Sequence, residues 1–189
     1  MKDPKKELQP YEVVPYTLDA FVKLLAKFGR GDRDFVAGKT STGYLANYFA
    51  DLGLKTIIVE TSYVDHDYLE DYTGYYARCF TEYPNRCARI HLFSIEFLED
   101  DMYSLLQGSG ALPQSKLQES YLGFMVIKPL PKRMIGKTCL KTYGTEGSRY
   151  YVRSRSYQAN LFGIPLTISN TLAFQEQDSV AAACATSAV

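Results

Sequence analysis

The chain has 189 residues, of which 46% are hydrophobic and 22% are charged. A chain of this length can bury one core of ordinary size, since domains usually run to ~100–200 residues. No apolar run approaches the ~18–20 residues that cross a bilayer, and the charged start Met1–Glu7 leads into no apolar segment, which argues against a membrane partner and a secretory signal. Four cysteines in this setting are expected to be reduced thiols of a cytoplasmic protein.

The 21 basic and 21 acidic residues balance, but they are segregated along the chain. Between Lys128 and Arg155 there are eight Lys or Arg residues and one acid, Glu146, so this segment carries 8 − 1 = +7 and the remainder carries −7. Acidic clusters lie at 60–71 and 96–101. Such asymmetry creates a potential that attracts an anionic partner, although a charge run is most often only a solvated face.

The N-terminal part is predicted to be helical after a flexible leader, residues 1–10. Thr17 is suited to cap a helix that ends at Gly29 and buries apolar residues at a spacing of three to four: Leu18, Phe21, Val22, Leu25 and Phe28. After a loop from Arg30 to Gly38, Thr40 or Ser41 is expected to cap a second helix that turns five residues inward: Tyr44, Leu45, Tyr48, Phe49 and Leu52. Gly38-Lys39-Thr40 lacks the earlier glycine of a phosphate-binding loop, because residue 33 is Arg, so an exposed helix start is favoured.

Strands and helices are expected to alternate in the next part. Residues 54–59 are predicted to form a strand, 63–80 show helical spacing, and 95–106 form a helix followed by a loop over 108–116. A strand over Cys87–Phe93 places Arg89, His91 and Phe93 on one face, because successive side chains point to opposite sides. The opposite face of the same strand carries Ala88, Ile90 and Leu92.

The remaining chain is typical of β-structure. The apolar run Tyr121–Ile127 predicts a strand buried on both faces, followed by strands over 135–143, 149–158 and 161–169, the last pair forming an antiparallel hairpin. We therefore expect a single α+β domain over 1–189, with a helix-rich part (11–116), a mainly antiparallel strand-rich part (117–177) and a short terminal helix (178–189).

The spacing of the cysteines and histidines in the first half of the chain does not favour a metal site. Cys79, Cys87 and His91, with His66 nearby, supply the thiol and imidazole groups of the first half. Their spacing, C-x7-C-x3-H, matches no common zinc frame, in which two close pairs of ligands set the geometry. We predict no metal and no cofactor.

The basic segment ends in an alternating pattern of cations and aromatic rings. As a strand, it projects five side chains from one face: Arg149, Tyr151, Arg153, Arg155 and Tyr157. Such a face can meet phosphates and stack on bases, which predicts binding of an anionic ligand such as a nucleotide or nucleic acid. The alternative is an amphipathic strand whose charged side is exposed to solvent and binds no ligand.

The C-terminal stretch places Gln175 and Gln177 before a small-residue helix that carries Cys184. A thiolate near a helix N-terminus is an activated nucleophile, and an upstream glutamine can stabilise an oxyanion. The stretch resembles the nucleophile segment of papain-like cysteine peptidases, including the bacterial bacteriocin-processing type. The resemblance implies Cys184 as the nucleophile and Gln175 or Gln177 as the oxyanion donor.

A wider resemblance is carried by Tyr63–Phe80 with Arg89–Phe93, by Tyr121–Pro131 and by Phe174–Ala188. These stretches look like an uncharacterised family of longer bacterial proteins.

Two departures from the papain-like pattern bear on activity. Counted from Asp178 as the cap, Cys184 is the sixth helical residue, beyond the first turn in which the helix dipole acts. Both histidines, His66 and His91, precede the cysteine, whereas the papain-like order places the base after it. We predict the front part of a papain-like cysteine hydrolase-like protein, inactive as this chain stands, with His91 as the residual candidate base. The alternatives are an anion-binding module and a terminal helix that serves packing or self-association.

Overall fold

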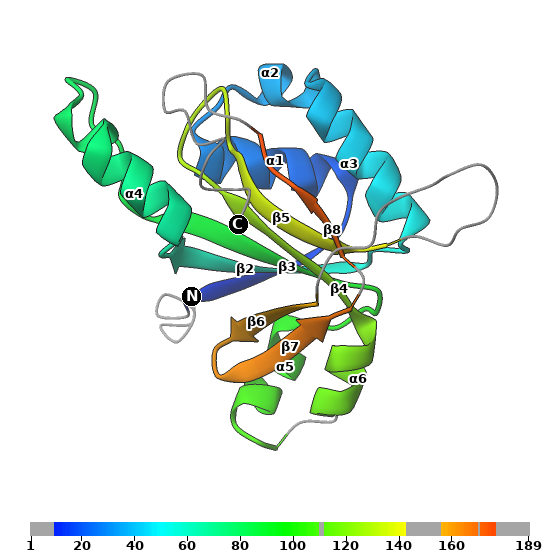
Figure 1. Cartoon of the computed structure of the whole chain (residues 1–189). Coiled ribbons are helices and arrows are strands. Elements are labelled where there is room, and N and C mark those ends of the chain that lie inside the picture. The colour runs from blue at the N-terminus through cyan, green and yellow to red at the C-terminus, as the bar shows by residue number, and fades with distance from the viewer. Residues whose placement is uncertain (1–9, 110–111, 143–155, 170, 177–189) are drawn as a thin grey trace, which may run out of the picture.

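A computed structural model describes residues 10–109, 112–142, 156–169 and 171–176 (Figure 1). Its centre is a six-stranded antiparallel sheet in the order β1-β2-β3-β4-β5-β8. The strands are β1 (Tyr11–Pro15), β2 (Thr56–Tyr63), β3 (Cys87–Phe93), β4 (Tyr121–Ile127), β5 (Ile135–Lys141) and β8 (Thr171–Phe174). The predicted α+β class is confirmed, but three of the strands, β1, β2 and β3, come from the part expected to be helix-rich.

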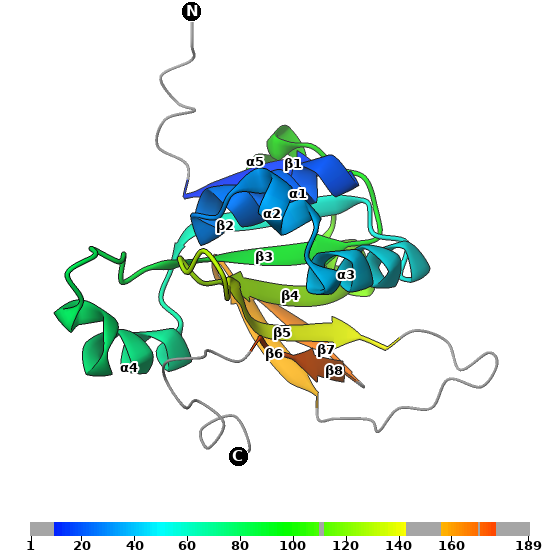
Figure 2. The same cartoon turned by 90° about the horizontal axis from the view of Figure 1, so that it is seen from above.

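The sheet is covered on both sides (Figures 1 and 2). One side, here called the helical face, lies under α1 (Leu18–Gly29), α2 (Arg33–Ala37) and α3 (Thr40–Asp51). The other side, the hairpin face, is covered by a two-stranded hairpin of β6 (Tyr157–Leu161) and β7 (Ile164–Ile168), together with α5 (Glu99–Leu106) and α6 (Gln114–Ser120). An arm made of α4 (His66–Gly74) and η2 (Tyr76–Arg78) extends beyond one end of the sheet.

The helical face encloses an apolar core between α1, α3 and the strands. Phe21, Leu25 and Phe49 of the helices are fully buried in one cluster with Ile57 and Ile90 of the sheet. The predicted alternation of β3 is confirmed, because Ala88, Ile90 and Leu92 all belong to this cluster. The opposite positions of β3 face the hairpin side and are equally buried, so the strand has no exposed face.

The first helix begins and ends where the sequence predicts. The Thr17 hydroxyl accepts a hydrogen bond from the Ala20 N–H at 3.0 Å, which is the predicted cap. The left-handed residue that terminates the helix is Arg30, with φ of 57°. Gly29 is required for close packing instead, because a Cβ there would lie 2.7 Å from the Cβ of Met134.

Three helical predictions are corrected. The second predicted helix has Lys39 at its N-cap with no side-chain cap, and Tyr44 is 52% exposed rather than turned inward. The predicted loop from Arg30 to Gly38 contains α2, because the Asp32 carboxylate accepts from two backbone N–H groups of its first turn. The predicted helix over 95–106 begins only at Glu99, and α6 begins inside the predicted loop over 108–116 and continues into the part expected to be strand-rich.

The predicted hairpin exists, but its turn lies later than expected. Phe162 and Gly163 form a two-residue turn with φ of 48° and 94°, and positive φ at both positions matches the twist of the strands. The Asn160 side-chain oxygen accepts from the Gly163 N–H at 2.7 Å and stabilises the turn. The predicted strand over 149–158 is therefore described only from Tyr157, since residues 143–155 lie outside the described ranges.

The hairpin is tied to α6 by one glutamine. The Gln118 amide donates to the Thr167 carbonyl at 2.8 Å, and its side-chain oxygen accepts from the Thr167 N–H at 2.9 Å. The carboxamide thus satisfies both backbone groups of one β7 residue, as a neighbouring strand would.

Among the helices that the structure describes, none combines the length and the hydrophobicity of a membrane-spanning segment.

Candidate functional site

The predicted site residues divide into two groups. Gln175, His91 and Tyr157 belong to the described residues. The other predicted residues lie outside them: Arg149, Tyr151, Arg153, Arg155, Gln177 and Cys184.

The chain that leads toward Cys184 is anchored directly after β8. Gln175 is half-buried, and the next residue, Glu176, is buried. The Glu176 N–H donates to the Ile135 carbonyl at 3.0 Å, and its carboxylate accepts from the Ile135 N–H at 3.2 Å. Backbone and side chain of one residue therefore bind the same position of β5.

The other partners of Glu176 come from the start of α3. The Lys39 ammonium lies 2.9 Å and 3.1 Å from the two carboxylate oxygens, and the Ser41 hydroxyl donates at 2.8 Å. Lys39 also donates to the Lys132 carbonyl at 2.8 Å. The Lys39 side chain is only 11% exposed, whereas Gly38 and Thr40 on either side of it are exposed, as predicted for this helix start. Glu176, Lys39 and Ser41 form what we call the Glu176 anchor.

His91 lies at the centre of a buried polar network on the hairpin face. Its Nδ1 is 2.9 Å from the Tyr121 hydroxyl, and its Nε2 is 3.3 Å from Glu60 Oε2. The same carboxylate oxygen accepts a short hydrogen bond from Arg89 Nε. Arg89 in turn donates to the Asn160 carbonyl of β6 at 2.6 Å, so the network also fastens the hairpin to the sheet.

The pKa shifts assign the protons of this network. Burial lowers the pKa of the His91 imidazole, and the positive charge of Arg89 acts in the same direction. Burial alone would raise the pKa of the Glu60 carboxyl, but hydrogen bonds from His91 and Arg89 outweigh it and hold that pKa below its ordinary value. A neutral His91 therefore donates from Nε2 to Glu60 and accepts from the Tyr121 hydroxyl, whose pKa burial raises well above 10.

This geometry bears on the histidines as candidate bases. The His91 side chain is 0% exposed and both ring nitrogens are engaged, which favours a structural role for this ring. His66 is 82% exposed on α4, where it lies 3.6 Å from Glu70 and 3.9 Å from Asp67. Its partners are the acids of its own helix.

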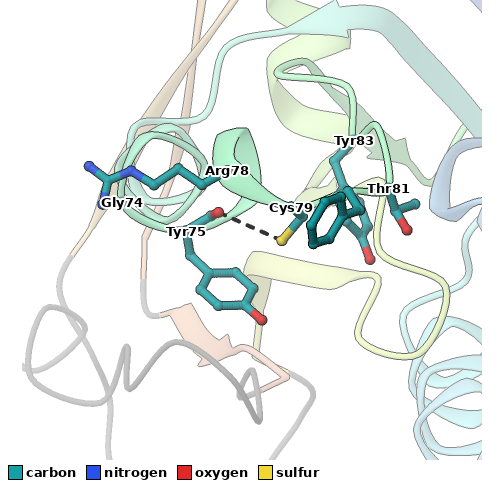
Figure 3. Close-up of a pocket in the computed structure, with 7 residues that line it drawn as sticks. Gly74, Tyr75, Arg78, Cys79, Thr81 and Tyr83 are labelled. Atoms are coloured by element: carbon teal, nitrogen blue, oxygen red, sulfur yellow. Dashed lines mark hydrogen bonds between the residues drawn. The ribbon is translucent and has the colours of Figure 1, made fainter.

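The thiols in the described ranges differ in environment. Burial raises the pKa of Cys139 to about 11, and burial also raises the pKa of Cys87, so neither thiol is activated. Cys79 lines a hollow of about 540 Å³ on the arm, where its thiol donates to the Tyr75 carbonyl at 3.7 Å (Figure 3). Within the described residues, no three His, Cys, Asp or Glu side chains are grouped to hold a metal ion.

The described end of the basic segment meets another cation. The Lys137 ammonium lies 5.6 Å from the centre of the Tyr157 ring, within the range of a cation–π interaction. Tyr157 is half-buried at the start of β6. The sequence pattern singled out Tyr157 but missed Lys137, because their contact joins β5 to β6 across the hairpin face.

No protein family, no curated protein and no solved structure matches this chain.

Proposed function

We propose that this chain is the front part of a papain-like cysteine hydrolase-like protein, in which the folded α+β unit holds the start of the segment that bears Cys184. The observation that carries the proposal is the Glu176 anchor, which fixes the chain 184 − 176 = 8 residues before the cysteine. A nucleophile has to be held to about 0.5 Å of its working position, and a rigid attachment nearby serves that need. The two candidate oxyanion donors, Gln175 and Gln177, directly precede and follow Glu176 in the sequence.

We also propose that this chain alone does not turn over a substrate. A cysteine nucleophile needs a base within hydrogen-bond reach. The chain has two histidines. The His91 side chain is fully buried, and both of its ring nitrogens are engaged by neighbouring side chains. His66 lies on the exposed arm, beside Glu70 of the same helix. The base of such a site would then be supplied by residues other than these two.

Thiol reactivity tests the proposal without a known substrate. The folded protein is treated with iodoacetamide between pH 6 and pH 9, and the adducts on the four cysteines are located by mass spectrometry. We expect Cys184 to react well before the buried Cys87 and Cys139, with the pH dependence of an ordinary thiol of pKa about 8.5. The buried pair is the internal control for an intact fold.

Two outcomes contradict the proposal. Protection of Cys184 to the same degree as Cys87 and Cys139 would identify it as a packing residue. Rapid, selective alkylation of Cys184 at pH 6 would mean that the thiol is already activated, so the chain could not be described as lacking its base.

A second candidate function is the binding of an anionic ligand through the segment from Arg149 to Tyr157. The observation that favours it is the contact between Lys137 and Tyr157, which adds a cation beside the described end of that segment. Binding of a single-stranded oligonucleotide should weaken steeply with KCl concentration, because each neutralised phosphate releases counterions. A variant with Arg149, Arg153 and Arg155 all replaced by Ala should bind far more weakly, and unchanged affinity would remove this candidate.

A further inference from the structure

The three helices of the helical face line a hollow that neither proposed function uses. It lies where α2 packs against both α1 and α3 (Figures 1 and 2). Its volume is about 540 Å³, within the range of about 300–1,000 Å³ that is usual for sites of small molecules. The hollow is therefore large enough for a ligand.

Part of the wall of the hollow is apolar. Leu18 and Val22 lie one turn apart on α1, and Ala37 is the last residue of α2. The helical spacing of α1 predicts a buried Leu18, but this side chain is 53% exposed. Its exposure follows from the hollow that it borders.

Gly43 leaves the hollow open on the side of α3. A glycine within a helix is less favourable than any other residue except proline, so it usually serves close packing or an unusual backbone conformation. Neither reason applies here, because the backbone is helical and an added Cβ would meet no atom within 4 Å. What the glycine provides is space beside the hollow.

The Thr42 hydroxyl is a second, independent observation at the same place. Thr42 lines the hollow and is only 1% exposed, and its Oγ1 has no hydrogen-bond partner among the described residues. A buried hydroxyl without a partner is costly, so a group that bonds to it from the hollow would gain free energy. Threonine in a helix uses two χ1 rotamers, and a change of rotamer can turn the hydroxyl toward such a group.

The charges at the hollow balance one another. Asp19 forms a hydrogen-bonded ion pair with Arg33 and lies 2.7 Å from the Lys23 ammonium. Asp34 is the second acid of the lining. Two cations and two acids give 2 − 2 = 0, which favours an uncharged ligand over an ion.

We propose that the hollow between α1, α2 and α3 binds a small uncharged amphiphile. The apolar body of the ligand lies against Leu18, Val22 and Ala37, in the space beside Gly43, and one hydroxyl or carbonyl group bonds to Thr42 Oγ1. Both groups are suited, because a threonine hydroxyl donates one hydrogen bond and also accepts. The site contains none of the residues of the hydrolase proposal or of the anion-binding segment.

Two probes of nearly equal shape test the hydrogen bond. Benzyl alcohol and ethylbenzene differ in a hydroxyl that takes the place of a methyl group, and each is titrated into isotope-labelled wild type and Thr42→Val. We expect saturable shifts of the amide resonances of residues at the hollow, such as Val22, Ala37 and Gly43. Thr42→Val should weaken the binding of benzyl alcohol by roughly three- to tenfold, the contribution of one hydrogen bond, and should not weaken the binding of ethylbenzene.

A substitution at Gly43 tests the space. Gly43→Leu places a side chain in the hollow and should weaken the binding of both probes by at least about tenfold, since that side chain would have to be displaced. Leucine is a good helix former, so the variant is expected to fold. The matched control is Ala50→Leu, at an exposed position two turns further along α3, and it should bind both probes as the wild type does.

Four results would overturn the proposal. They are the absence of shifts at the hollow with either probe, unchanged affinity of Thr42→Val for benzyl alcohol, an equal loss of both probes in Thr42→Val, and unchanged binding to Gly43→Leu. Cys184→Ala should bind both probes as the wild type does, so failure of the hydrolase proposal would leave this result unchanged.

Discussion

The two faces of the central sheet differ in the charges that they bury. On the helical face, strand residues such as Ile57 and Ile90 belong to one apolar cluster with side chains of α1 and α3. On the hairpin face, the same strands bury Glu60, Arg89 and His91. Neighbouring positions on one strand therefore make contributions of different physical origin.

The difference teaches where stability and specificity come from in this fold. Apolar burial on the helical face contributes roughly 25 cal/mol for each Å² of surface removed from water and tolerates substitutions that conserve side-chain volume. Buried charges on the hairpin face contribute little net free energy while they are paired, but they are costly when one partner is lost. The hairpin face is thus the side on which single substitutions have specific consequences.

The largest effect should come from breaking the buried pair. Glu60→Leu leaves Arg89 without its carboxylate and His91 without the acceptor of its Nε2–H, so we expect a loss of about 3–5 kcal/mol in the free energy of unfolding. Urea denaturation measures it. The matched control is Ile57→Val on the opposite face of the same strand, for which about 0.5–1.5 kcal/mol is expected. Equal losses for the two variants would contradict the comparison.

The pH dependence of stability should sharpen the comparison next. The pKa of His91 is lowered in the folded state, so the unfolded chain binds a proton at higher pH than the folded one. The contribution of His91 is therefore fully present above its unfolded pKa of about 6.5 and is lost as the pH falls below it, by up to about 1.4 kcal/mol per pH unit. A separate loss, from the lowered pKa of Glu60, should begin below about pH 4.5.

Denaturation at a series of pH values between 7 and 5 provides the measurement. His91→Gln should flatten this part of the profile, whereas His66→Gln on the exposed arm should leave the slope as it is in the wild type. A profile that stays flat in the wild type would show that His91 does not change its protonation on folding.

The smallest effects concern two hydroxyl groups that the described structure leaves without a hydrogen-bond partner, Thr42 Oγ1 and the Tyr11 hydroxyl. Thr42 lies in α3 over the helical face, and Tyr11 belongs to the core of the hairpin face. Thr42→Val and Tyr11→Phe should each raise the free energy of unfolding by about 1 kcal/mol, since each removes a buried polar group that has no partner. Thermal unfolding of both variants measures the gain, and a loss in either would indicate a partner for that hydroxyl.

Much of the architecture could be predicted from periodicity. Period-two alternation located β3 and assigned Arg89 and His91 to one face, and the Thr17 cap located α1. In contrast, α6 escaped prediction because Leu117 is its only apolar residue among polar ones, which leaves no helical period to detect. Local patterns detect elements that bury a regular stripe and miss those that bury a single side chain.

The networks could not be predicted because they depend on which strands are neighbours. Glu60 meets Arg89 through the register between β2 and β3, and a shift of that register after Glu60 is invisible in the sequence. Likewise, Glu176 lies between Gln175 and Gln177, the candidate oxyanion donors, and its partner Lys39 lies 137 positions earlier in the sequence. Contacts of this kind follow from topology.

Gln118 has a consequence for how copies of the protein meet one another. A two-stranded hairpin offers free backbone donors and acceptors along its edges, and such edges invite pairing with a strand of another molecule. At Thr167 the Gln118 carboxamide already occupies both the N–H and the carbonyl. An incoming strand would first have to displace this amide. The Gln118 side chain of α6 therefore opposes edge-to-edge aggregation through β7.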